Sequence, residues 1–249
     1  MLLRRLSSPD GVELSEPLGA ALALELHYQD SHGHDGDPEG WLVLFSEASA
    51  ESDDERLPLA AARLLPGVRA GWADPAVDVA MRSIEATLLS VNVAEDRNLA
   101  AAAIDALERI VGGAYRPGEG VAHAVGAPAF VRGGFADHVR SASALLTAYL
   151  LTDRLPYAML ADELMQSVLR TPQRAEVPFA LECDAARVFC RLAALHRDRE
   201  YQRTAVLPVG GDYGESARRT LEPLVPSVRL LGVKAAPFGL ALAEWLDLQ

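Results

Sequence analysis

Apolar residues recur every three or four positions through the C-terminal two-thirds of the chain, which is the spacing of amphipathic helices. The clearest stripes are Val77, Met81, Ile84 and Leu88; Leu99, Ala102, Ala103, Ala106, Leu107 and Ile110; Phe135, Val139, Ala142, Leu145, Leu146 and Tyr149; and Val188, Phe189, Leu192 and Leu195. Asp74 followed by Pro75 is a typical helix start, and Gly112 with Gly113 is a typical end. We therefore predict helices from residue 74, over 95–111, from 135, and over 157–169, 184–195, 213–221 and 238–246.

The first 73 residues carry a weaker pattern. Leu14, Leu18, Leu22 and Leu26 form one helical stripe. The apolar run 41–45 fits either a short strand or a buried helix, and the small, acidic stretch 48–55 is expected to be a linker. We therefore predict an N-terminal segment over 1–73 and a helical-hairpin domain over 74–249, unless the two form one continuous domain.

The predicted helices follow one another as antiparallel pairs with short turns between them, and we find no tandem repeat of fixed period. This order predicts a mainly all-α fold, built as an array of α-hairpins or as a partial or truncated (α/α) toroid.

Composition narrows the class of protein. The chain has 249 residues and a formal net charge of -12. Such a surface repels nucleic acid and anionic membranes, so neither is expected as a partner. No apolar stretch reaches the roughly 20 residues of a membrane span, and no secretory signal is found, so we expect a cytoplasmic location. Lys234 is the only lysine among the basic residues, which is typical of the coding bias of a GC-rich bacterium.

A long Gly- and Pro-rich loop over 115–134 holds the main candidate site. His123 lies in this loop, and Asp137 with His138 opens the next helix. A carboxylate and imidazoles can act as general acid and base, so these three are the candidate catalytic residues. Tyr115, Glu119 and Arg132 are the candidate substrate-binding residues. The alternative is that Asp137 only stabilises a helix N-terminus and that glycines order a surface loop.

Other candidate sites are weaker. The densest run of ligand-type side chains contains Asp30, His32, His34, Asp35, Asp37 and Glu39, but its spacing fits no EF-hand, and a solvated loop is the simpler interpretation. Glu182 and Asp184 are expected to cap a helix, or to reach a cleft if the fold is a toroid. Cys183 and Cys190 lie too far apart on one helix to form a disulfide. No nucleotide-binding, hydrolase-elbow or paired-cysteine motif is found, so no cofactor is expected and no metal site is predicted.

Three clusters of residues carry a family resemblance over about 74–249. They are Tyr115, Arg116, Pro117, Gly118, Gly120, Val121, Ala122 and His123; then Asp137, His138, Val139, Ala144, Leu145, Leu146, Ala148, Tyr149, Tyr157, Ala161 and Leu164; then Asp184, Ala185, Ala186, Leu192, Asp198, Tyr201 and Ala205. This stretch resembles the helical region of the thioredoxin-domain-containing proteins related to spermatogenesis-associated protein 20. That region is similar to the six-hairpin (α/α) toroids of N-acylglucosamine 2-epimerases and several glycosidases. The family's thioredoxin-like domain is absent here, and the chain is too short for twelve toroid helices in addition to its first 70 residues.

Two functional hypotheses follow. The resemblance implies a protein that binds a small carbohydrate or acts on one, as an epimerase or hydrolase would, through acid–base residues of the loop. Alternatively, the chain is a non-catalytic helical interaction or scaffold protein, in which lost hairpins leave an apolar edge that a second copy covers as a homodimer.

Overall fold

The computed structural model describes residues 36–51, 54–92, 96, 98–126, 131–171, 177–205 and 212–249. Over these ranges the protein is mainly all-α, as predicted, with a two-stranded antiparallel sheet. The elements are α3 (Pro38–Glu51), α4 (Arg56–Ala70), η1 (Gly71–Ala73), α5 (Val77–Leu89), α6 (Leu99–Ala114), β1 (Tyr115–Arg116), β2 (Gly120–Val121), α7 (Phe135–Thr152), α8 (Leu155–Arg170), α9 (Phe179–Arg197), α10 (Arg199–Thr204), α11 (Tyr213–Leu221), η2 (Glu222–Leu224), α12 (Val225–Leu231), η3 (Gly232–Ala235) and α13 (Ala236–Leu246).

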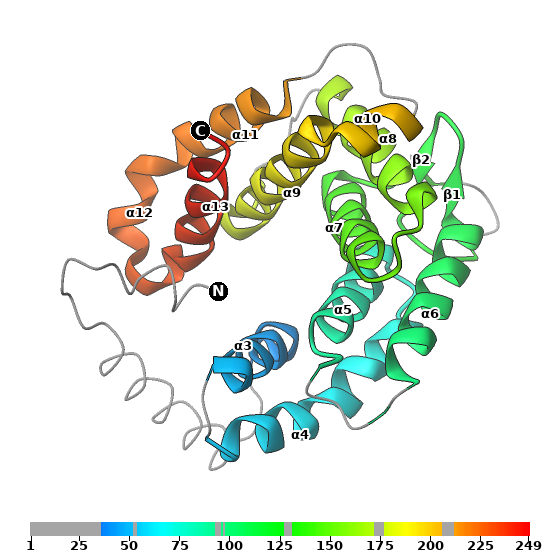
Figure 1. Ribbon diagram of the computed structural model, residues 1–249, viewed down its shortest axis with the longest axis vertical. Helices are drawn as coiled ribbons and strands as arrows, with labels where there is room; N and C mark the ends of the chain where they lie inside the picture. The colour runs from blue at the N-terminus through cyan, green and yellow to red at the C-terminus, as the bar shows by residue number, and fades with distance from the viewer. Residues whose placement is uncertain are drawn as a thin grey trace.

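The helices lie in two rows along a curved path (Figure 1). The inner row consists of α3, α5, α7, α9 and α13, and each of these helices packs against the next one in the row. The outer row consists of α4, α6, α8, α11 and α12. The close pairs α3–α4, α5–α6 and α7–α8 are helical hairpins, each with one inner and one outer member. The described chain is therefore built from helical hairpins that follow a curved path.

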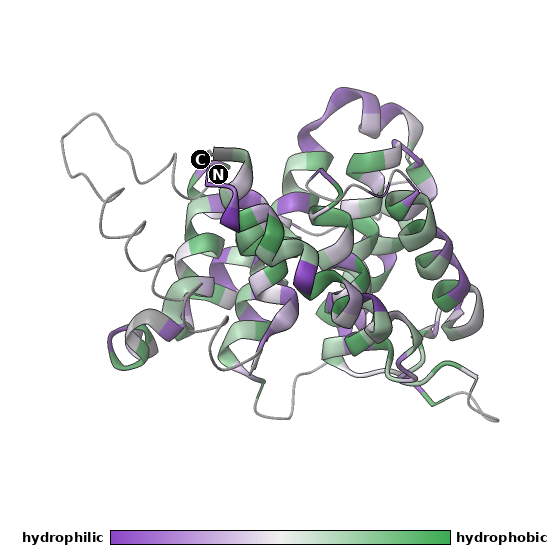
Figure 2. Cartoon of the chain, turned by 90° about the horizontal axis from the view of Figure 1, so that it is seen from below, coloured by the Kyte–Doolittle hydropathy of each residue, from purple (hydrophilic) through white to green (hydrophobic). Residues whose placement is uncertain are grey.

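The main hydrophobic core lies between helices of the two rows. Met81, Leu107, Leu145 and Leu164 are 0–1% exposed there, and they come from α5, α6, α7 and α8. Burying one such side chain stabilises the fold by about 1.5–3 kcal/mol. Figure 2 shows apolar and polar positions sharing the same helices, as amphipathic packing requires. None of the described helices is both long enough and apolar enough to cross a membrane.

The N-terminal part of the described chain is helical. The run 41–45 lies inside α3, where Leu42 and Phe45 are each 1% exposed, so the helix alternative holds and no strand forms there. The predicted linker over 48–55 is wrong in its first half, because α3 continues to Glu51. Helix α4 was not predicted, and Pro66 lies inside it. The stripe from Leu14 to Leu26 lies outside the described residues.

Four predicted helix ends are also wrong. Asp74 is not the N-cap of α5, because its Oδ1 accepts from the Ala76 backbone N–H at 2.8 Å and the helix begins at Val77. Helix α6 begins at Leu99 rather than at residue 95, and it runs through both glycines to Ala114. Helix α9 begins at Phe179, directly after Pro178.

The early start of α9 changes the interpretation of two candidates. Glu182 and Asp184 do not cap this helix, because both lie inside it. Cys183 and Cys190 are on the same helix, both buried and free, as expected. The predicted boundary at residue 73 stays a prediction, although α3 and α4 both pack on α5 and Trp72 belongs to the main core.

Candidate functional site

The loop over 115–134 folds into a small hairpin against α7 and α8. Strands β1 and β2 pair so that Tyr115 faces Val121 and Arg116 faces Gly120. The hairpin contacts α6 through β1, and α7 and α8 through β2 (Figure 1). The chain after β2 is held on two sides, because the Val77 N–H donates to the His123 carbonyl at 2.9 Å and the Gly133 N–H donates to the Val121 carbonyl at 2.8 Å. These bonds bring the loop to the amino ends of α5 and α7.

His123 and Asp137 form a direct pair at this position. Nδ1 of His123 lies 3.1 and 3.2 Å from the two carboxylate oxygens of Asp137. The imidazole side chain is 57% exposed, whereas that of Asp137 is 3% exposed. The hydrogen bond to Asp137, followed by the attraction of its charge, raises the pKa of His123. Asp137 Oδ2 also accepts from the Gly134 N–H at 2.7 Å, so the helix-stabilising role holds as well.

His138 faces away from solvent. Its ring is buried, and Nδ1 lies 2.7 Å from the Gly134 carbonyl. Nε2 has no hydrogen-bond partner among the described residues, and it lies against Gly120, where an added Cβ would be 2.3 Å away. Burial lowers the pKa of His138. The structure therefore brings His123 and Asp137 together but does not present His138 beside them to a ligand.

The three predicted substrate-binding residues are spread over the loop 115–134. The Tyr115 hydroxyl donates to Glu163 at 2.7 Å, and burial together with that bond raises the pKa of Tyr115 to about 12. Glu119 is exposed in the turn between the strands. Arg132 is also exposed, and its guanidinium donates to the Ser167 hydroxyl at 3.2 Å. These contacts fasten the hairpin to α8, and they do not converge on one ligand position.

A set of charged groups on the inner helices was largely missed by the sequence analysis. Glu85 of α5 accepts from Ser143 at 2.6 Å and from Thr147 at 3.1 Å, both on α7, and Arg191 of α9 lies 3.4 Å away. The Glu85 side chain is 11% exposed. One carboxylate therefore connects three inner helices.

The same pattern continues along the row. Arg140 of α7 pairs with Asp184 of α9 at 2.9 Å, and Arg187 of α9 pairs with Glu244 of α13 at 2.9 Å. Burial raises the pKa of Asp184, and Arg140 works against that shift. We call this set the inner polar row; its members are Glu85, Arg140, Ser143, Asp184, Arg187, Arg191 and Glu244. The signal in the sequence was the spacing of Asp184, Arg187 and Arg191, which places three charges on one face of α9.

A cavity of about 700 Å³ opens at the carboxyl ends of α7 and α9. We call it the carboxyl-end cavity; the polar and aromatic residues that line it are Tyr149, Asp153, Arg191, Asp198, Glu200, Tyr201 and Thr204. Arg191 belongs both to this lining and to the inner polar row. No catalytic candidate from the sequence analysis lines it.

The lining of the carboxyl-end cavity combines negatively charged carboxylates with one positively charged guanidinium. Burial, and then the negative charges of Asp153, Asp198 and Glu200, raise the pKa of Tyr149. The rings of Tyr149 and Tyr201 meet edge to face, with centroids 6.4 Å apart. The Tyr201 hydroxyl is buried and has no hydrogen-bond partner among the described residues. The cavity therefore offers several acceptors, one guanidinium and two aromatic rings.

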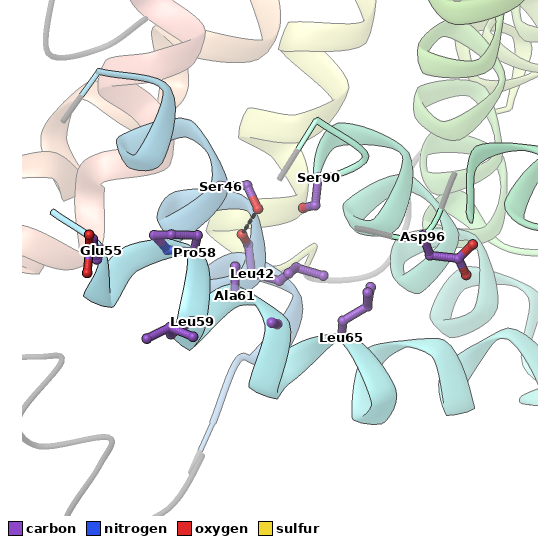
Figure 3. Close-up of a pocket in the computed structure, with 10 residues that line it drawn as sticks. Leu42, Ser46, Glu55, Pro58, Leu59, Ala61, Leu65, Ser90 and Asp96 are labelled. Atoms are coloured by element: carbon purple, nitrogen blue, oxygen red, sulfur yellow. Dashed lines mark hydrogen bonds between the residues drawn. The ribbon is translucent and has the colours of Figure 1, made fainter. Parts of the chain in front are cut away.

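A second cavity, of about 410 Å³, lies between α3 and α4 and the end of α5 (Figure 3). Its lining is mostly apolar and includes Leu42, Leu59 and Leu65. The hydroxyl of Ser46 donates to the Leu42 carbonyl at 2.7 Å, so it is already used inside α3. This cavity has few polar groups free to orient a ligand.

The metal-binding candidates of the sequence lie mostly outside the described residues. Of that run, Asp37 pairs with Arg82 at 2.5 Å, and Glu39 accepts from the Ser83 hydroxyl at 2.7 Å. Both contacts join the start of α3 to α5. Among the described residues, Asp78, His123 and Asp137 form a different group, with one donor atom from each lying within 4.8 Å of the others.

Comparison with known proteins adds no family to this picture. No protein-family model matches the chain, and no curated protein matches it. The resemblance to the helical region of the thioredoxin-domain-containing proteins therefore stays a prediction, and the functional argument depends on the geometry above.

Proposed function

We propose that the protein binds a small, uncharged carbohydrate in the carboxyl-end cavity. The observation that carries this proposal is the lining of the cavity, where tyrosine rings stand beside carboxylates and a guanidinium. A volume of about 700 Å³ lies within the range of roughly 300–1,000 Å³ that is usual for small-molecule sites.

The chemistry of a sugar matches this lining. Each sugar hydroxyl can donate one hydrogen bond and accept others, as serine and threonine hydroxyls do. The cavity supplies acceptors on Asp153 and Glu200 and donors on Arg191. Arg191 is held by Glu85 and Ser143 at 3.4 Å, so it is oriented before a ligand arrives. Tyr149 offers an aromatic face for the apolar C–H groups of a sugar ring.

This proposal concerns binding rather than catalysis. Asp137 is in the first turn of α7, and Tyr149 is near its end. At a rise of 1.5 Å per residue the two positions are about 18 Å apart, which is too far for one small sugar to reach both. Acid–base catalysis by Asp137, His138 and His123 therefore stays a separate prediction.

Thermal melts with mono- and disaccharides test the proposal. A ligand at 100 times its dissociation constant stabilises the folded state by about 2.7 kcal/mol, which in a chain of this size raises the melting temperature by roughly 5–10 °C. We expect Tyr149→Leu and Glu200→Gln to remove the shift. Glu222→Gln, which changes a 67% exposed carboxylate on η2, should leave it unchanged.

Two results would contradict the proposal. One is a melting temperature that no sugar changes. The other is a sugar-dependent shift that persists in both cavity variants. A shift with spermidine in place of sugars would show that the carboxylates select a cation, and it would equally reject an uncharged ligand.

A homodimer is the second candidate, and one observation favours it. Leu230 and Val225 on α12 are 88% and 55% exposed, which is unusual for two large apolar side chains on one short helix. A second copy of the chain would cover them. Sedimentation velocity over a range of concentrations should show a dimer that Leu230→Glu converts to monomer, and a monomer at every concentration would reject this candidate.

A further inference from the structure

Three side chains from separate segments meet at the amino ends of the inner helices. Asp78 lies in the first turn of α5, His123 follows β2, and Asp137 lies in the first turn of α7. Donor atoms of the three, one from each, lie within 4.8 Å of one another. The Asp137 carboxylate is almost fully buried, whereas the His123 ring is open to solvent, so the group is anchored on one side and accessible on the other.

The backbone holds this group in place without help from a ligand. The chain around His123 is paired with the start of α5 through the bridge between Ala76 and Ala124. A second bridge, between Ala122 and Arg132, closes the loop next to α7. Asp137 is oriented by the Gly134 N–H, which donates to its Oδ2 at 2.7 Å. Groups outside the ligand set that fix a ligand's orientation in this way are typical of metal sites.

We propose that Asp78, His123 and Asp137 bind one divalent transition-metal ion, with zinc as the best fit. Imidazole nitrogen combined with carboxylate oxygen suits zinc and its neighbours in the first transition row better than calcium or magnesium, which prefer oxygen alone. Two carboxylates together carry two negative charges and a neutral imidazole carries none, so the three ligands balance the charge of a divalent cation.

The distance between His123 and Asp137 agrees with one ion bound by both, and the donor atom of Asp78 lies within 4.8 Å of each of them. Zinc bonds to histidine nitrogen and carboxylate oxygen are about 2.0–2.2 Å long. Two donors on one ion therefore lie roughly 3–3.5 Å apart at tetrahedral or octahedral angles. Nδ1 of His123 and Oδ1 of Asp137 are 3.1 Å apart. Three protein ligands leave a coordination position for water, as in open zinc sites.

This site is independent of the proposed carbohydrate site, because the two lie at different ends of α7. The test uses the full chain after treatment with EDTA, titrated with zinc chloride and separately with calcium chloride in a calorimeter. We expect one zinc ion per chain and no comparable calcium binding. Asp78→Asn and His123→Ala should each weaken zinc binding by roughly tenfold or more.

A matched control comes from the second Asp–His pair of the chain. His196 lies 2.7 Å from Asp162 and belongs to no group of three ligand-type side chains among the described residues. His196→Gln should therefore leave zinc binding unchanged. Circular dichroism of each variant tests whether it is folded. The His123 side chain is 57% exposed, so we expect its replacement to be tolerated.

Other outcomes would overturn the proposal. If the folded chain takes up no zinc, His123 and Asp137 form an ion pair and nothing more. If zinc binding survives Asp78→Asn and His123→Ala but is lost in His32→Ala or His34→Ala, the ion belongs to the histidine run near the N-terminus, and the site proposed here does not exist.

Discussion

Replacing Gly120 by alanine tests how closely the hairpin fits against α7. Gly120 has a φ of +85°, and an added Cβ would lie 2.3 Å from Nε2 of His138 and 3.2 Å from the nearest ring carbon. Gly118, in the same turn, has a φ of +75° and nothing within 4 Å of the position of its Cβ. The two glycines therefore both have a positive φ but differ in their surroundings.

The expected magnitudes follow from this difference. An L-residue in the left-handed region costs about 1–2 kcal/mol, and both alanine variants should lose that much. Forcing an extra methyl group against a buried ring costs about 1–3 kcal/mol more, and only Gly120→Ala should show this loss. We expect Gly118→Ala to lower the free energy of unfolding by about 1–2 kcal/mol and Gly120→Ala by about 2–5 kcal/mol.

Urea unfolding followed by circular dichroism measures the free energy of unfolding of both variants. The dependence of that free energy on urea concentration must be the same in both for the values to be compared. In a His138→Ala background the ring is gone, so the gap between the two glycine variants should shrink. Equal losses for Gly118→Ala and Gly120→Ala in the natural background would refute the close contact between the hairpin and α7.

Three further predictions concern buried polar groups. Glu85→Ala should lower the free energy of unfolding by about 3–5 kcal/mol, because it leaves an arginine and two hydroxyls without their carboxylate, while Glu222→Ala should change it by less than about 1 kcal/mol in the same urea assay. Burial lowers the pKa of His138 below its ordinary 6.5, so the unfolded chain takes up a proton that the folded chain resists. The contribution of His138 to the free energy of unfolding should be constant above pH 6.5 and fall as the pH drops below that value. Urea unfolding at several pH values measures this, and the same dependence of the free energy of unfolding on pH in His138→Gln and in the natural chain would contradict it. Burial raises the pKa of Cys183 and of Cys190 to about 12, so an aromatic disulfide reagent should react with these thiols only after unfolding. Rapid reaction of the folded chain would show that the thiols on α9 are accessible to solvent and would contradict this prediction.

Much of the fold was predictable because helical periodicity is a strong local signal. Helix α7 begins at the predicted residue 135, α8 extends the predicted range 157–169 by a few residues, and α11 has its predicted bounds. Helix α4 was missed although Leu57, Ala61, Leu64 and Val68 recur at helical spacing and are buried, and Pro66 lies inside this helix. In the structure the proline is tolerated within an outer helix.

The candidate site was only partly predictable. The sequence places His123 in the loop over 115–134 and Asp137 at the start of the next helix, and the structure brings these two side chains together. Asp78 could not be linked to them, because its contribution depends on the backbone pairing of α5 with the loop after β2. The carboxyl-end cavity is lined by Tyr149, Arg191 and other residues from four helices, and no local sequence pattern predicts that these residues lie together.

Hydrogen exchange measured by mass spectrometry tests the carbohydrate site most directly. The exchange of the full chain would be recorded with and without the sugar that gives the largest thermal shift. The proposal predicts slower exchange in the peptides covering 149–155 and 198–204, with little change over 115–138. Protection confined to 115–138, or no protection anywhere, would contradict binding in the carboxyl-end cavity.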